Sequence, residues 1–148
     1  MALMEKLDRR ILALLARDGR MSYTDIGKET GLSTSAAQQR VRRLEQRGVI
    51  KGYRAILDSA ELGLMVTAFV AIKPFDPGQA DDAPERLHDI EEIISCYSVA
   101  GDASYLLKVQ VQNMAHLESL LARIRSAGKV ATHTTTVLSI PYEDRPPI

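Results

Sequence analysis

The chain has 148 residues, of which 45% are apolar and 5% aromatic, and its formal net charge is zero. This length predicts one or two small domains. No apolar run approaches the ~20 residues that a membrane span needs, and the charged stretch from Glu5 to Arg10 interrupts any signal-peptide core. We therefore expect a cytoplasmic protein. Cys96 is the single cysteine, which excludes a disulfide framework; we expect a small buried strand residue, with a reactive thiol as the alternative.

The zero net charge hides two halves of opposite sign. Residues 1–60 hold twelve Lys or Arg and seven Asp or Glu, a net charge of +5. Residues 61–148 hold seven and twelve, a net charge of −5. A basic half can approach a polyanion that an acidic half avoids. The asymmetry therefore indicates two domains with different tasks.

Two short helices are predicted at the start of the basic half. Apolar residues from Leu7 to Leu15 recur at helical spacing, and the Asp-Gly pair after residue 17 ends this helix. Ser22 can cap the second helix, with Asp25 as its capping-box partner. Gly31 follows its end.

A third helix, predicted from Ser33 to Gly48, has one apolar and one polar face. Ser33 can cap its N-terminus, and Gly48 lies where it stops. Ala37, Val41 and Leu44 define the apolar face. The remaining surface offers hydroxyl, amide and guanidinium groups, and no acidic residue occurs between residues 33 and 44. The side chains predicted to contact DNA are Thr34, Ser35, Gln38, Gln39, Arg42 and Arg43.

These residue types suit base and phosphate recognition. Gln can bond adenine through two hydrogen bonds, and Arg can bond guanine in the same way or hold a phosphate. A solvated basic face on an ordinary surface helix is the alternative reading. Three short helices, the last two joined by a tight turn containing glycine, are typical of a helix-turn-helix unit. The sequence therefore predicts DNA binding.

The acidic half predicts a ferredoxin-like βαββαβ domain, so the fold class is α+β. Helices are expected after Pro84 and after Asn113, the latter stopping at Gly128. The first strand is apolar on both alternating faces, and two helices can cover only one of them, so we expect a second copy on the other. The predicted strands are Met65–Lys73, Ile93–Val99, Tyr105–Val111 and Val130–Ile140. The predicted divisions are 1–50 for DNA binding, 51–64 as a β-prone connector (with a possible strand at 49–58) and 65–148 for dimerisation.

The runs GLSTSAAQQRVRRLEQRGVIKGY and SVAGDASYLLKV, in this order of elements, resemble the Lrp/AsnC (feast/famine) family of transcription regulators. The resemblance spans nearly the whole chain. It implies a DNA-binding helix-turn-helix and a C-terminal domain that dimerises through its sheet and often assembles to octamers. It also implies a small amino-acid effector bound between C-terminal domains.

Carried over to this chain, the effector loop corresponds to residues 99–104, and the Thr-rich stretch 132–136 lines the same region. Two positions depart from the family pattern: Ala100 replaces Thr before the glycine, and Ser104 replaces Asp before the tyrosine. Asp102 is the one acidic side chain nearby that could meet an ammonium group. The residues predicted to bind the effector are Ala100, Gly101, Asp102, Ser104, Thr134 and Thr136. A plain hairpin turn is the alternative.

Two other classes of function compete with this reading. An enzyme of the same architecture, similar to the sirohaem decarboxylases, would need His or Arg around a tetrapyrrole. His88, His116 and His133 have no metal-ligand spacing, and the chain has no GxSxG or P-loop motif. We therefore predict no catalytic residue, no metal and no cofactor. A sensing module without DNA binding would not explain the charge asymmetry.

Overall fold

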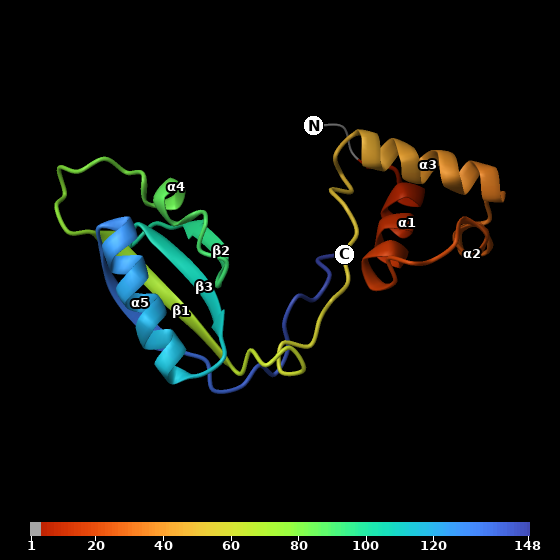
Figure 1. The fold of residues 1–148 in the computed structure, drawn as a ribbon. Coiled ribbons are helices and arrows are strands. Elements are labelled where there is room, and N and C mark those ends of the chain that lie inside the picture. The colour runs from red at the N-terminus through yellow and green to blue at the C-terminus, as the bar shows by residue number, and fades with distance from the viewer. Residues whose placement is uncertain (1–3) are drawn as a thin grey trace. The chain divides into compact units, whose positions relative to one another are not determined.

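The computed structural model describes residues 4–148, so the first three residues of the predicted DNA-binding domain lie outside the described part. The chain divides into two compact units. The first contains the residues up to 56 together with residues 142–148, and the second contains residues 57–141. Figure 1 shows the helical first unit and the sheet of the second.

The first unit contains three helices with the predicted caps. They are α1 (Lys6–Arg17), α2 (Tyr23–Thr30) and α3 (Thr34–Gln46). The Ser22 hydroxyl accepts a hydrogen bond from the Asp25 amide, and the Ser33 hydroxyl accepts one from the Ala36 amide. Gly31 and Gly48 both take positive φ, at 76° and 72°, where an L side chain would be strained. The sequence predicts these helix ends correctly because a capping residue or a glycine acts only on the turn next to it.

A small apolar core holds the three helices together. Ile11 comes from α1, Ile26 from α2, and the predicted Ala37, Val41 and Leu44 come from α3. All five are almost fully buried. Leu7, Leu14 and Leu15, also predicted to face inward, are only half-buried.

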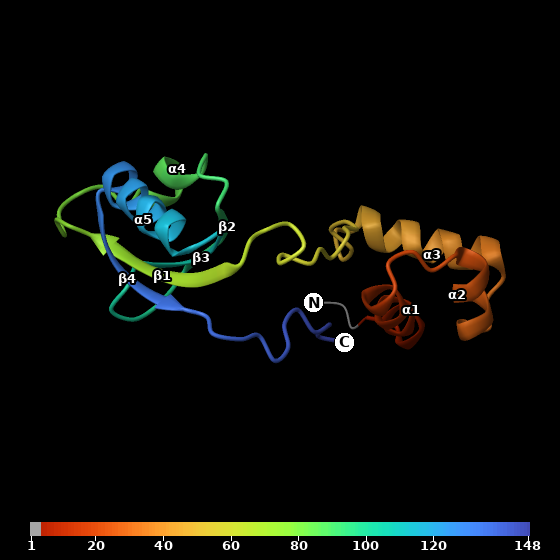
Figure 2. The ribbon, with the colours of Figure 1, turned by 60° about the horizontal axis from the view of Figure 1, so that its bottom comes forward.

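The second unit has the predicted βαββαβ order. Its sheet is antiparallel and runs β2-β3-β1-β4. Figure 2 shows both helices on the same face of this sheet. The elements are β1 (Val66–Pro74), α4 (Ala83–Leu87), β2 (Ile93–Ser98), β3 (Tyr105–Val111), α5 (Met114–Gly128) and β4 (Val130–Thr136).

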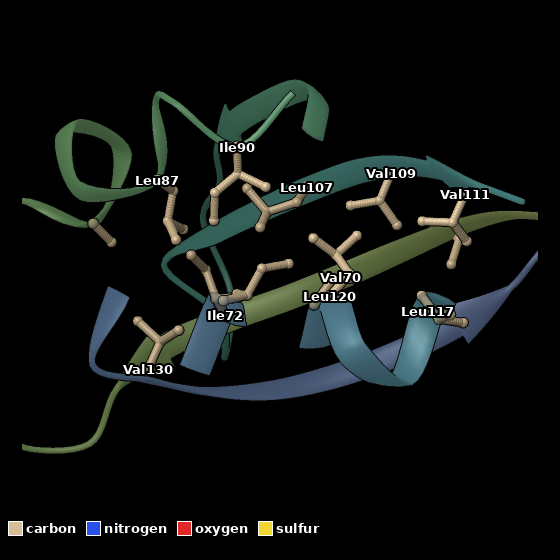
Figure 3. Close-up of a cluster of buried hydrophobic side chains, with 13 residues drawn as sticks. Val70, Ile72, Leu87, Ile90, Leu107, Val109, Val111, Leu117, Leu120 and Val130 are labelled. Carbon is tan, nitrogen blue, oxygen red and sulfur yellow. The ribbon is translucent and has the colours of Figure 1, made fainter. Parts of the chain in front are cut away.

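The core of the second unit lies between the sheet and its helices (Figure 3). It draws alternate residues from β1 and β3, because successive strand side chains point to opposite faces. From the helical layer, Leu87, Leu117, Leu120 and Ile124 pack against them.

Three features of the strands differ from the prediction. Residues 49–58 form no strand, because no neighbouring segment of the described chain pairs with their backbone. β4 ends at Thr136 rather than residue 140. Cys96 lies in β2 as predicted but is exposed rather than buried, because β2 is an edge strand.

The helix after Asn113 stops at Gly128, as predicted, although a different residue supplies its left-handed cap. Gly128 is the last residue of α5, and the left-handed C-cap conformation belongs to Lys129, with φ 52°. A Cβ on Gly128 would lie 3.3 Å from side-chain atoms of Leu87 and Val130. The glycine therefore allows close packing of the helix end rather than the turn itself.

The face of the sheet away from the helices is mixed rather than uniformly apolar. Phe69 and Ala71 on β1 are half-buried, as is Leu106 opposite Ala71 on β3. Polar residues interrupt this group, including Lys108 opposite Phe69 and His133 opposite Ala71.

Candidate nucleic-acid interface

The outward face of α3 holds the six residues predicted to contact DNA. Thr34, Ser35, Gln39, Arg42 and Arg43 are exposed, and Gln38 is half-buried. Neither Arg42 nor Arg43 forms an ion pair with another residue of the described chain 4–148. A helix of 13 residues is about 20 Å long, and the major groove of B-DNA admits a helix. The structure thus places five exposed residues and the half-buried Gln38 along α3, and the Thr34 hydroxyl also lies 3.3 Å from the hydroxyl of Thr24 on α2.

A charged cluster fixes α3 against α1. The guanidinium of Arg40 contacts a carboxylate oxygen of Glu5 at 2.9 Å and one of Asp8 at 3.0 Å. The Asp8 side chain is only 7% exposed. The hydrogen bonds that Arg40 donates to Glu5 and then to Asp8 raise the pKa of Arg40. Arg40 therefore positions the helix, while the neighbouring arginines remain available to a ligand.

The turn between α2 and α3 depends on a glycine that the sequence did not single out. Gly27 is buried within α2, and its carbonyl accepts a hydrogen bond from the Leu32 amide at 3.0 Å. A Cβ at Gly27 would lie 2.5 Å from the Leu32 carbonyl oxygen. No larger residue fits there without movement of the backbone. The only signal in the sequence is a glycine inside a helical pattern, which suggests a close approach.

The segment that follows α3 makes a hydrogen bond back to that helix through Tyr53. The Tyr53 hydroxyl donates to a carboxylate oxygen of Glu45, near the end of α3, at 3.1 Å. Burial, and then this hydrogen bond, raise the pKa of Tyr53 to about 12. Tyr53 therefore stays neutral and remains a donor at physiological pH.

The loop predicted to bind an effector forms the connection between β2 and β3. The Val99 amide donates to the Ser104 carbonyl, and the Ser104 amide donates to Ile72 on β1. Gly101 has φ 149° and open space around its Cβ position. Beside this loop is a hollow of about 430 Å³. Its lining residues are Ala71, Ile72, Lys73, Asp102, Ala103, Ala131, Thr132 and His133.

Of the predicted effector residues, Asp102 alone lines this hollow. Thr134 pairs with Val70 and Thr136 pairs with Ala68, and both of these β1 residues belong to the core beneath the helices. Paired residues project to the same face of a sheet. The two threonines therefore point to the helix-covered face, whereas His133 points to the opposite one. Thr132 and His133 belong to the stretch 132–136 that was predicted to line this region, whereas Lys73 was not predicted there.

The three histidines lie on different elements and do not form one site. His88 follows α4 and is exposed, and His133 lies on β4. His116 on α5 contacts Glu92 at 3.2 Å, and Arg123 contacts the same carboxylate at 2.7 Å. Among residues 4–148, no group of three or more His, Cys, Asp or Glu is placed to hold a metal ion.

The fold and the exposed helix define a two-domain protein with a helix-turn-helix unit and a ferredoxin-like unit. Residues 4–45 match the AsnC-type helix-turn-helix domain, and residues 67–147 match the Lrp/AsnC ligand binding domain. The chain belongs to the Lrp/AsnC family, as its sequence motifs predicted.

Named relatives are transcriptional regulators. The chain is 49% identical to the regulator LrpA of Mycobacterium tuberculosis, over 96% of this chain and 95% of that one. It is 36% identical to the leucine-responsive regulatory protein of Klebsiella pneumoniae, over 91% and 85%. A feast or famine regulatory protein from M. tuberculosis complexed with L-methionine has a TM-score of 0.94 and 49% identity, covering 96% and 97%. These names favour a regulator over an enzyme. Within residues 4–148, no helix is long and apolar enough to cross a membrane.

Proposed function

We propose that the protein regulates transcription by binding a specific double-stranded DNA site through α3. The observation that carries this proposal is the exposed face of α3. There Arg42 and Arg43, which form no ion pair within residues 4–148, lie beside Gln38 and Gln39. Gln39 contacts a base edge and Arg43 contacts a phosphate. A dimer presents two such helices, so its site is pseudo-palindromic, with half-sites about one helical turn or a multiple apart.

DNA titrations with two variants test these roles. Gln39→Ala is expected to cost about 1–3 kcal/mol and to relax preference at one base position. Arg43→Ala is expected to weaken all sequences alike and to reduce the salt slope by about 1. Arg123→Ala, on α5, is a charge-matched control that leaves DNA affinity unchanged. Equal binding of genomic operator and random DNA by the wild type would refute the proposal.

We also propose that the protein dimerises through the outer face of its sheet and assembles further. Phe69, Ala71 and Leu106 supply the apolar centre of this interface. Phe69→Lys is expected to convert the dimer into a monomer in sedimentation experiments, whereas Glu118→Lys on the exposed side of α5 is not. A wild-type chain that sediments as a monomer at micromolar concentration would overturn this step.

A small amino acid is the proposed effector, and it binds in the hollow beside residues 99–104. Asp102 meets the ammonium group, and Lys73 in the same hollow supplies a positive charge for the carboxylate. The L-methionine complex of the similar M. tuberculosis protein supports this class of ligand. The effector acts through its different affinity for two assembly states; a tenfold change in DNA binding needs about 1.4 kcal/mol of coupling.

Calorimetry with each of the twenty amino acids tests the sensing role. Asp102→Ala is expected to weaken binding about tenfold or more, because a hydrogen bond to a charged group contributes about 1.5–3 kcal/mol. Asp76→Ala, in the loop after β1, is the control. If Asp102→Ala leaves the affinity unchanged, its assigned role is wrong. If no amino acid binds at millimolar concentration, the protein is not a sensor of this kind.

A further inference from the structure

The last seven residues of the chain form part of the DNA-binding unit. Residues 142–148 group with the residues up to 56, although they follow β4 in the sequence. Ile148 is half-buried. In contrast, Leu138, ten residues earlier, is 98% exposed. The side chain of Ile148 is therefore packed more closely than that of Leu138.

That partner is a shallow hollow of about 350 Å³ on the first unit, which we call the tail groove. One wall comes from the second half of α1, and the other comes from the segment that follows α3. Pro147 and Ile148 lie in the groove. Its other lining residues are Leu12, Leu15, Ala16, Val49, Ile50, Lys51, Gly52 and Tyr53.

The chemistry of the tail suits an apolar groove. Pro146 and Pro147 have fixed φ angles and no backbone N–H group, so these two residues lose little conformational entropy on docking and bring no donor that needs a partner. Ile148 adds an aliphatic side chain at the end of this stiff segment. The guanidinium of Arg145 stacks on the Tyr142 ring, 3.9 Å from its centroid, which further orders the tail.

Two features connect the docked tail with the candidate effector site and with α3. The tail is the direct continuation of β4, whose residues Thr132 and His133 line the hollow beside Asp102. The tail groove is built from α1, which holds Arg40 of α3 through Asp8, and from the residues that follow α3. β4 at the candidate effector site is thus joined along the chain to a tail that packs within the unit holding the candidate reading helix.

We propose that residues 146–148 are a tether that docks in the tail groove of their own chain. The tether gives the DNA-binding unit a second connection to the sheet, in addition to residues 57–65. Occupancy of the hollow beside β4 alters DNA affinity through this connection. The coupling rests on the proposed function, whereas the docking does not.

Hydrogen exchange on the full-length protein tests the docking. Ile148→Asp places a charge in the apolar groove, and we expect several-fold faster exchange in peptides covering residues 12–16 and 49–53, with β1–β4 unchanged. Ala16→Glu, an exposed helix position in the groove wall, should have the same effect from the other side. Because both changes break one contact, the double variant should add nothing further. Ile148→Leu is the matched control and keeps wild-type exchange. Unchanged exchange in Ile148→Asp would overturn the tether.

An equimolar mixture of the two variants separates a tail from the same chain from one donated by a second copy. If the tail docks on its own chain, neither protomer of a mixed dimer has an intact contact, and exchange stays fast. Recovery of slow exchange in part of the population would show that a second copy supplies the tail, and our assignment would be wrong.

DNA titration with and without L-methionine tests the coupling. We expect Ile148→Asp to bind DNA alone and to lose most of the effector-dependent change in affinity, whereas Ile148→Leu keeps it. An undiminished effector response in Ile148→Asp would refute the coupling. A wild type that responds to none of the twenty amino acids would contradict the sensing role instead, and the exchange result would stand.

Discussion

The second unit buries thirteen apolar residues in one cluster, whereas the described part of the first unit buries five. The sheet unit relies on packing between a sheet and its helices. The helix-turn-helix unit has fewer buried apolar side chains to stabilise it. It also relies on the close backbone approach at Gly27, on two helix caps and on the ion pairs of Arg40. A small unit that must expose one helix to a ligand therefore depends more on local geometry than on its core.

The largest expected effect tests the packed core of the sheet unit. Leu120 is fully buried, and Leu120→Ala should lower the free energy of unfolding by about 2–5 kcal/mol, from lost burial and the cavity left behind. Urea denaturation followed by circular dichroism measures this change. Glu118→Ala, an exposed residue on the same helix, should stay within about 0.5 kcal/mol of wild type. Similar losses in both variants would break the comparison.

A substitution at Gly27 tests the dependence of the first unit on local geometry. Alanine is favoured over glycine in a helix by about 1 kcal/mol, but the added Cβ would meet the Leu32 carbonyl oxygen at 2.5 Å. We expect Gly27→Ala to destabilise the unit by about 1–3 kcal/mol, the usual range for overpacking. Gly52→Ala is the control, because its Cβ position is open. A higher melting temperature for Gly27→Ala would contradict this expectation and would show that the backbone at Leu32 moves away from the added Cβ at little cost.

Glu92 is expected to make the stability of the sheet unit sensitive to acid. The hydrogen bond from Arg123 is the main cause that lowers its pKa from 4.5 to about 2, and His116 adds to it. Because the folded-state pKa is depressed, the stabilisation is present above pH 4.5 and is lost as the pH falls toward 2. Arg123 is half-exposed, so screening limits the effect to about 1 kcal/mol. Urea titrations should show Glu92→Gln less stable than wild type at pH 7 and nearly equal to it near pH 2. A pH-independent difference would contradict this account.

The smallest expected effect concerns the start of α3. Ser33→Ala removes the hydroxyl that accepts from the Ala36 amide at 3.1 Å and should cost about 1 kcal/mol. Ser33→Asn keeps a capping acceptor and should restore most of that loss. Amide exchange in the first turn of α3 provides the measurement. If alanine and asparagine behave alike, the cap contributes little to this unit.

The sequence alone determined features whose causes lie within a few residues. Ser22, Ser33 and Asn113 each cap a helix as predicted, because a cap needs only its own first turn. The alternation in β1 and β3 and the spacing in α3 and α5 identified most of both cores. The exposed face of α3 followed from the same periodicity. The order βαββαβ was sufficient to predict the sheet and its helical layer.

Other features depend on segments that meet only in the folded chain. Whether residues 49–58 form a strand depends on a backbone partner, and none lies beside them within the described chain. The pairing of Arg40 with Asp8, 32 residues away, required the crossing of two helices. The register between β1 and β4 decided that His133, rather than Thr134, faces the side of Ala71. These outcomes are non-local because hydrogen bonding and close packing act through space, whereas a sequence pattern describes only neighbours along the chain.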